Sequence, residues 1–208
     1  MKRHNHPSGR TRAARRVLIA GVLGVAMLAT AHGQPLSGAW LDAKPVHNWN
    51  KIAERIPRAP APAGDSATSG RCARTVRPAS TREDRAVEAA GWKLFRPYEL
   101  YATTSLVAGM ASVDGMCRPL QFNVFVFSNA QFAGTLSPVL MNSRTDGDLQ
   151  ETYLIDSSSI MATFSRYKDQ DPRCCPSRVS TLEYALISSH AHPLVTPMQA
   201  TTAPSGSQ

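Results

Sequence analysis

The spacing of apolar residues changes near residue 98, and this change predicts one helix followed by a series of strands. Residues 80–83 have the sequence Ser-Thr-Arg-Glu, typical of a capping box in which Ser80 caps the first turn and Glu83 reaches back to it. Apolar residues follow at helical spacing, and Gly91 stands where a helix would end. The pattern predicts a helix over residues 81–90.

Beyond residue 98 the apolar positions follow the two-residue period of β-strands. Residues 120–127 alternate and then become apolar on both faces, which predicts a central strand covered on both sides for half its length. The connections are too short for parallel crossovers. The sequence therefore predicts a two-layer α+β fold, with an antiparallel meander sheet of about five to six strands and one main helix. The other strands are predicted over residues 103–113, 131–136, 151–156, 160–167 and 179–187.

Two flanking segments have different patterns. Trp49, Ile52 and Ile56 have helical spacing, which predicts a short amphipathic helix. Residues 57–70 are rich in proline, alanine and glycine, a composition typical of an extended linker. Residues 189–208 are rich in serine, threonine and proline and show little apolar periodicity, which predicts a flexible tail.

The first 33 residues have the pattern of an export signal. Six lysines and arginines, with no acidic residue, precede an uncharged apolar run of 15 residues that ends in small residues. A bilayer-spanning helix needs roughly 20 apolar residues, so a cleaved signal peptide is favoured over a retained anchor. Arg15 and Arg16 also resemble a twin-arginine signal, and that export route stays open. The predicted organisation is a signal peptide (1–33), an N-terminal segment with a Pro/Ala-rich linker (34–70), a disulfide-bonded α+β domain (71–188) and the tail (189–208).

The formal net charge of +8 at first favours a nucleic-acid ligand. Removal of the first 33 residues leaves 17 basic and 15 acidic residues, a net charge of +2. Binding to nucleic-acid phosphates needs clustered lysines and arginines. We therefore expect no nucleic-acid partner.

The chain has four cysteines, all after the predicted signal: Cys72, Cys117, Cys174 and Cys175. An even number in an exported chain predicts a disulfide framework, with three alternative connectivities. The favoured interpretation is that Cys174 and Cys175 each pair with a distant cysteine. The alternative is a disulfide between the two neighbours that acts as a redox switch.

Catalytic patterns are scarce in this sequence. No histidine lies between Cys72 and Ser188, whereas Ser-His-Asp and Cys-His catalysis require an imidazole beside the nucleophile. The chain also lacks a Gly-x-Ser-x-Gly elbow, a glycine-rich phosphate loop and an EF-hand pattern. Adjacent cysteines seldom both bind one tetrahedral ion. We therefore expect no metal, no cofactor and no enzymatic activity.

Three arginines, Arg118, Arg144 and Arg166, are candidate contacts for an anionic ligand. The favoured alternative is that they form ion pairs with nearby aspartates, because solvated charges specify little. Asp146 is a fourth candidate. It would belong to an ordinary turn or, with Asp114, to the pair of facing carboxylates that a glycosidase needs.

Several motifs occur in order along the chain: residues 109–111, the Asp-Gly-Met-Cys-Arg-Pro of 114–119, 125–127, 132–138, the Ser-Arg-Thr-Asp-Gly of 143–147, Arg166-Tyr167 and Cys174-Cys175-Pro176-Ser177. Together they resemble the LppP/LprE lipoprotein family of bacterial exported proteins over residues 71–187. The resemblance implies a cell-envelope location and a fold built around the cysteines, without an established catalytic residue. This chain lacks the lipidated cysteine, so we expect a periplasmic or secreted protein without stable membrane insertion after signal cleavage.

Three functional hypotheses follow from these patterns. The first is a non-catalytic binding or structural module that contacts an envelope component or a protein partner. The second is a small carboxylate-based hydrolase that acts on envelope glycans. The third is a thiol redox protein that uses Cys174 and Cys175. The sequence predicts neither the ligand nor the oligomeric state.

Overall fold

The computed structural model describes residues 38–68, 70–189 and 192–206. The chain divides into two units, residues 1–33 and 34–208, and every described residue belongs to the second. The predicted signal peptide and its cleavage site therefore lie outside the described residues.

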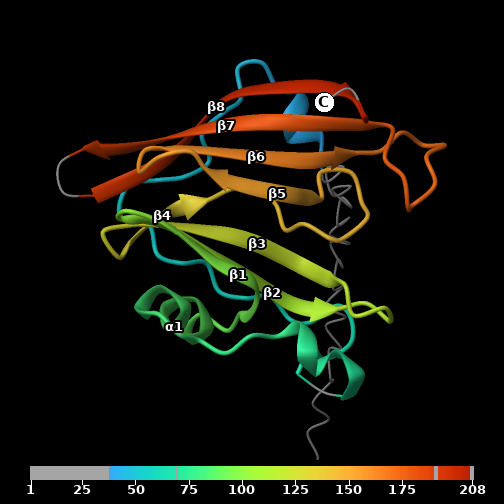
Figure 1. The fold of residues 1–208 in the computed structure, drawn as a ribbon, viewed down its shortest axis with the longest axis horizontal. Helices are drawn as coiled ribbons and strands as arrows, with labels where there is room; N and C mark the ends of the chain where they lie inside the picture. The colour runs from blue at the N-terminus through green and yellow to red at the C-terminus, as the bar shows by residue number, and fades with distance from the viewer. Residues whose placement is uncertain (1–37, 69, 190–191, 207–208) are drawn as a thin grey trace, which may run out of the picture. The chain divides into compact units, whose positions relative to one another are not determined.

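The described residues form eight strands, one α-helix and two short 3-10 helices (Figure 1). The strands make two four-stranded antiparallel sheets, in which each strand pairs with its sequence neighbours. The first sheet contains β1 (Lys93–Tyr101), β2 (Thr104–Val113), β3 (Pro119–Ser128) and β4 (Gln131–Thr135), and the second contains β5 (Leu149–Leu154), β6 (Ser159–Arg166), β7 (Arg178–Ser189) and β8 (His192–Pro204). The helix is α1 (Arg82–Ala89), and the 3-10 helices are η1 (Ala39–Asp42) and η2 (Gly70–Thr75).

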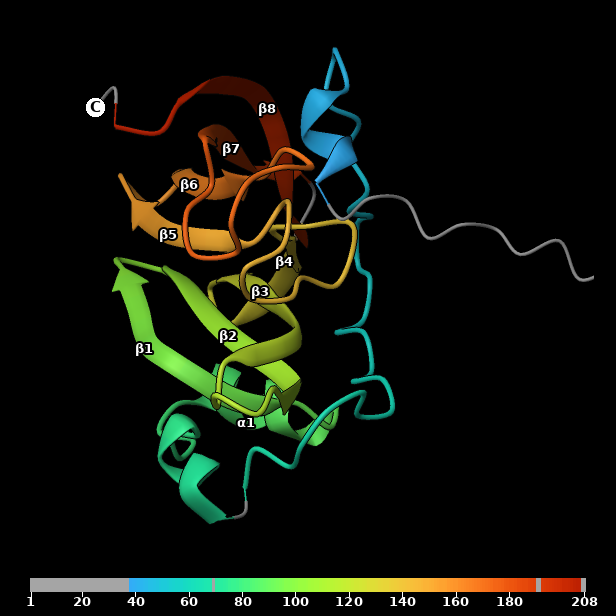
Figure 2. The ribbon, with the colours of Figure 1, turned by 90° about the vertical axis from the view of Figure 1, so that its right-hand side faces the viewer.

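The antiparallel meander and the single main helix are confirmed, but the predicted count of five to six strands in one sheet is wrong. Strand β1 was missed because Arg96 and Pro97 interrupt its alternation, and its register with β2 shifts between Phe95 and Glu99. The described chain is mostly β and has three layers, with α1, the first sheet and the second sheet stacked in that order (Figure 2).

The predicted flexible tail instead contains β8, which pairs with β7 from His192 to Pro204. Its prolines made the segment look irregular. Proline is tolerated on an edge strand because the N–H that it lacks would face away from the ladder. Strand β8 is such an edge, and its register shift falls opposite Pro197.

Two apolar clusters explain the layers. The first lies between the sheets, where Phe122 and Val126 of β3 share a core with Phe164 and Tyr184 of the second sheet. The second lies beneath the first sheet, where Phe125 and Phe127 pack with residues of α1, β1 and β2. Strand β3 is thus covered on both faces, as its sequence predicts.

Helix α1 begins one residue later than the sequence predicts. Thr81 is the N-cap, and its hydroxyl accepts the N–H of Asp84 while the Asp84 carboxylate accepts the N–H of Thr81. Burial raises the pKa of Asp84, but hydrogen bonds from Arg77 and the backbone of Ser80 outweigh this and hold the pKa well below its ordinary value. The Arg77–Asp84 ion pair, at 2.6 Å, ties the helix to the preceding segment.

Residues 38–68, here called the strap, do not form the predicted amphipathic helix at 49–56; the only helix in this described stretch is η1. The side-chain amide of Asn50 donates to the carbonyls of Thr135 at 3.0 Å and Val195 at 3.1 Å, and its oxygen accepts the N–H of Thr135 at 2.8 Å. Asn50 therefore joins β4 of one sheet to β8 of the other. At Gly134, where φ is +136°, an added Cβ would lie 2.4 Å from this amide.

The Pro/Ala-rich part of the strap is extended, as predicted, but side chains of the sheet and its neighbours bind it. Trp92 donates its indole N–H to the carbonyl of Pro57 at 2.7 Å. Gln121 donates to the carbonyl of Ala61 and accepts the N–H of Ala63 at 2.7 Å. Prolines remove donors but leave carbonyls free, so a proline-rich segment is well suited to such contacts.

The disulfide pattern differs from the favoured prediction. Cys72 pairs with Cys117 across 45 residues, which confirms a covalent staple on the domain. Cys174 and Cys175 pair with each other rather than with distant cysteines. The two distant partners expected for them are already joined, because η2 brings Cys72 beside the β2–β3 turn.

We predict that Cys72→Ala with Cys117→Ala lowers the free energy of unfolding by up to about 4 kcal/mol, because the bond closes a 45-residue loop. Urea unfolding of the parent and the variant measures this change. The matched control is Cys174→Ala with Cys175→Ala, which opens no long loop and should change the stability by less than about 1 kcal/mol. Equal losses in the two variants would contradict the assignment.

Candidate functional site

Most of the motifs found in the sequence lie at one end of the two sheets, although they are far apart in the chain. Residues 114–118 join β2 to β3, residues 136–148 join β4 to β5, and residues 167–177 join β6 to β7. Together they line a cavity of about 410 Å³, here called the arginine cavity. Its lining residues are Ala63, Asp114, Arg118, Leu120, Asn142, Ser143, Arg144, Thr145 and Arg173.

One arginine of the cavity lining forms an ion pair, whereas the other two do not within the described residues. Arg118 donates to Asp114 at 2.6 Å, and Asp114 also accepts the N–H of Met116 at 2.8 Å. Burial raises the pKa of Asp114, but the bonds from Arg118 and the backbone outweigh it, so the pKa lies below its ordinary value. Within the described residues, no hydrogen bond or ion pair engages the guanidinium of Arg144 or Arg173. The lining therefore carries three cations and one anion.

The loop that carries Arg144 is fixed by hydrogen bonds. Arg144 has φ +62°, in the left-handed region that non-glycine residues rarely adopt. Its N–H donates to the Asp148 carboxylate at 2.6 Å. On either side, Asn142 accepts the N–H of Gln121 at 2.8 Å, and the Thr145 hydroxyl donates to the Asn142 carbonyl at 2.7 Å. These bonds offset a backbone cost of about 1–3 kcal/mol and place Arg144 on the cavity wall.

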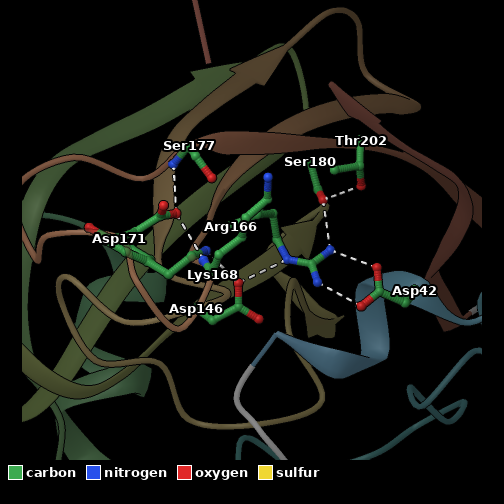
Figure 3. A network of polar contacts seen from close by, with 9 residues as sticks. Asp42, Asp146, Arg166, Lys168, Asp171, Ser177, Ser180 and Thr202 are labelled. Atoms are coloured by element: carbon green, nitrogen blue, oxygen red, sulfur yellow. Dashed lines mark hydrogen bonds and ion pairs between the residues drawn. The ribbon is translucent and has the colours of Figure 1, made fainter. Parts of the chain in front are cut away.

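The loop that carries Arg173 is closed by Asp171. The Asp171 carboxylate accepts the N–H of Lys168 at 2.8 Å and that of Ser177 at 2.9 Å, as Figure 3 shows. The bond from Lys168 is the main cause of the lowered pKa of Asp171. The Tyr167 hydroxyl donates to the carbonyl of Arg173 itself at 3.0 Å.

Arg166, a predicted ligand contact, does not line the cavity. Its side chain is 3 % exposed and donates to Asp42 at 2.6 Å, to Asp146 at 3.0 Å and to Ser180 at 3.1 Å (Figure 3). Hydrogen bonding to Asp42 raises the pKa of Arg166, and the same bond lowers the pKa of Asp42. The expectation that arginines pair with aspartates is confirmed for Arg118 and Arg166.

Asp146 likewise belongs to this buried network and is absent from the cavity lining. It accepts Arg166 and the N–H of Tyr167 at 2.8 Å. Asp114 and Asp146, the pair considered for a hydrolase, are therefore each held by a different arginine. Among the described residues, no cluster of histidine, cysteine or acidic side chains could hold a metal ion.

Arg173 was not predicted as a site residue. The only pattern that marks it is its position directly before the cysteine pair, within a motif that the sequence singles out for other reasons. The disulfide between Cys174 and Cys175 is exposed. It directly follows Arg173 in the sequence, so an accessible disulfide lies next to a residue of the cavity wall.

A smaller cavity of about 260 Å³ lies beside the strap. It is lined by Trp40, Ala43, Val46, His47, Asn48, Trp49 and Pro138. Its two indoles meet edge to face with ring centroids 5.1 Å apart. No acidic, lysine or arginine side chain lines it, so it lacks the charge that would orient an ionic ligand. No helix in the described ranges is long and apolar enough to cross a membrane.

The titration of Asp148, which is 6 % exposed, should make the stability of the protein depend on pH. Burial raises its pKa from 3.8 to about 6. The folded state then keeps this proton to a higher pH than the unfolded state, so its stabilising contribution is lost as the pH rises from about 4 to 6. Asp148→Asn cannot titrate and keeps an acceptor for the Arg144 N–H. We predict that the stability of this variant relative to the parent increases by about 2 kcal/mol across this interval.

Urea unfolding at pH 4.0 to 7.5 tests this prediction. The control is Asp169→Asn, a substitution of the same type at an exposed position. If the curves of the Asp148 variant and the parent stay parallel through the whole interval, Asp148 is not the group responsible.

Comparison with known proteins gives one match. No curated protein and no solved structure matches the chain. A family model described as LppP/LprE lipoprotein matches residues 98–187, a range that contains every lining residue of the arginine cavity except Ala63. This family suggests an exported protein of the bacterial envelope. Over residues 98–187 the chain is thus similar to the LppP/LprE lipoprotein family, and the resemblance predicted from its motifs is confirmed there.

Proposed function

We propose that the protein is a non-catalytic binding module of the bacterial envelope, and that the arginine cavity is its binding site for an anionic group. The observation that carries the proposal is that Arg144 and Arg173 both line one cavity, while within the described residues no hydrogen bond or ion pair engages either guanidinium. Arg144 and Arg173 both line this cavity, two like charges at one cavity repel one another, and an anion bound there would relieve this repulsion. The envelope location rests on the family match.

The way in which these arginines are held supports binding. A flexible surface arginine loses conformational freedom when it binds, whereas a loop already fixed in the bound geometry reduces that loss. Hydrogen bonds to the side chains of Asp148 and Asn142 fix the Arg144 loop, and bonds to Asp171 fix the Arg173 loop. The backbone that carries each arginine is thus fixed, which limits the freedom to be lost on binding to that of the exposed side chains.

The composition of the lining favours binding over turnover. General acid–base catalysis needs a side chain whose pKa lies near the operating pH and that can reach the substrate. The carboxylate in the cavity is Asp114, whose pKa is lowered and whose oxygens accept Arg118 and backbone N–H groups. Asp148 has a suitable pKa, but it is buried and lies outside the lining. These contacts do not favour the hydrolase hypothesis.

Purified cell-wall material that retains its anionic polymers is the probe for the first experiment. We predict that Arg144→Gln with Arg173→Gln reduces the protein's cosedimentation with this material at least tenfold at low salt. The control is Arg82→Gln with Arg85→Gln, which removes the same charge from exposed positions on α1. The control should bind like the parent. Equal binding by all three proteins would refute the proposed site.

Thiol redox chemistry is a second candidate function, which the pairing of Cys174 with Cys175 favours. Both residues are exposed, whereas Cys72 in the other disulfide is 5 % exposed. An external dithiol would transfer two electrons and two protons to the pair, giving two thiols, and would itself become a disulfide.

We predict that mild treatment with dithiothreitol, followed by thiol alkylation and peptide mass mapping, labels Cys174 and Cys175 before Cys72 and Cys117. The more exposed disulfide should be reduced first, because exchange requires direct attack by a thiolate on sulfur. A peptide that links Cys174 or Cys175 to either distant cysteine before reduction would eliminate this candidate.

A further inference from the structure

We propose that the arginine cavity recognises a phosphate monoester, a tetrahedral dianion attached to a small organic group, in preference to a carboxylate or a phosphate diester. The inference rests on the proposed function, because it names the ligand class of the same cavity. The charge, the hydrogen-bond donors and the volume of the cavity each favour this ligand class.

The first step is the charge of the lining. Asp114 compensates Arg118 at 2.5 Å, so the lining has a net charge of +2 from Arg144 and Arg173. A phosphate monoester carries between −1.5 and −2 at neutral pH because its second pKa is about 6. A carboxylate or a phosphate diester carries −1 and would leave one guanidinium uncompensated. The charge of the cavity therefore matches the dianion.

The second step is the number of donors. A guanidinium presents five N–H groups in a planar fork that fits the oxygens of carboxylate or phosphate groups in pairs. Two forks, from Arg144 and Arg173, offer more donors than the two oxygens of a carboxylate accept. The Ser143 hydroxyl also lines the cavity. The three terminal oxygens of a monoester can accept hydrogen bonds from more of these donors than the two oxygens of a carboxylate can.

The third step is the space beside the charges. A cavity of about 410 Å³ exceeds the volume of one phosphate group and lies in the range of small-molecule sites. Leu120 and Ala63 give this part of the wall an apolar surface. The organic part of the ester would lie against these residues while its phosphate faces the arginines. Because Ala63 belongs to the strap, the strap would thus help to select the organic part of the ligand.

Isothermal titration calorimetry with the purified protein tests the inference. The probes are glycerol 3-phosphate and glucose 1-phosphate as monoesters, dimethyl phosphate as the diester, and acetate as the carboxylate. We expect the monoesters to bind at least tenfold more tightly than dimethyl phosphate or acetate. Their affinity should increase between pH 5 and pH 7.5, as the second phosphate proton dissociates.

Four variants locate the binding. Arg144→Gln and Arg173→Gln should each weaken monoester binding at least tenfold, whereas Arg85→Gln on α1 should not change it. Arg144→Lys keeps the charge but loses the fork, so it should bind with intermediate affinity. Circular dichroism verifies that each variant is folded.

The outcomes separate this inference from the proposed function. If acetate binds as tightly as the monoesters and both arginine variants lose it, the phosphate preference is wrong while the anion site stands. If cell-wall binding depends on Arg144 and Arg173 but no monoester binds, the ligand class is again wrong. If neither monoesters nor cell-wall material respond to the substitutions, both proposals fail.

Discussion

The guanidinium of Arg166 is the contact on which the organisation of the molecule most depends. It lies inside the second sheet at the end of β6 and binds Asp42 of the strap, Asp146 of the β4–β5 loop and Ser180 of β7. The Arg166 side chain is 3 % exposed, so loss of an acidic partner would leave a buried charge without full compensation and destabilise the fold. Since Asp146 is two residues from Arg144, the same contact that anchors the strap also supports the wall of the arginine cavity.

Local sequence patterns predicted the positions of most strands correctly, but not the total number of strands or of sheets. The alternation in residues 120–127 located β3 and its two covered faces, because burial on both sides leaves a direct mark on residue type. Strands β1 and β8 were missed, because Pro97 and Pro197 interrupt the pattern at positions where an edge strand tolerates them. Whether strands form one sheet or two depends on contacts such as that of Asn50 with β4 and β8, which no short-range pattern encodes.

At the candidate site, too, the sequence indicated candidate residues but not the contacts that they make with residues far away in the chain. Arg118 and Arg144 were predicted from charge alone and do meet at one cavity, whereas Arg166 and Asp146 serve a buried network. One acidic partner of Arg166 is Asp42, which lies 124 residues away in the N-terminal segment that the sequence places before the α+β domain. The pairing of Cys174 with Cys175 was disfavoured because an exported chain favours long-range bridges, whereas η2 in fact places Cys72 beside Cys117 and leaves the two neighbours to pair.

The strap has a consequence for how the molecule behaves when crowded. A sheet edge with unpaired backbone groups can recruit strands from other molecules and lead to aggregation. Asn48 and Asn50 of the strap bind β8, and Asn50 also binds the neighbouring β4. At the opposite edges, β1 is interrupted at Arg96 and Pro97, and β5 is six residues long with a register irregularity beside Glu151. Each open flank of the two sheets thus carries a feature that disfavours edge-to-edge polymerisation.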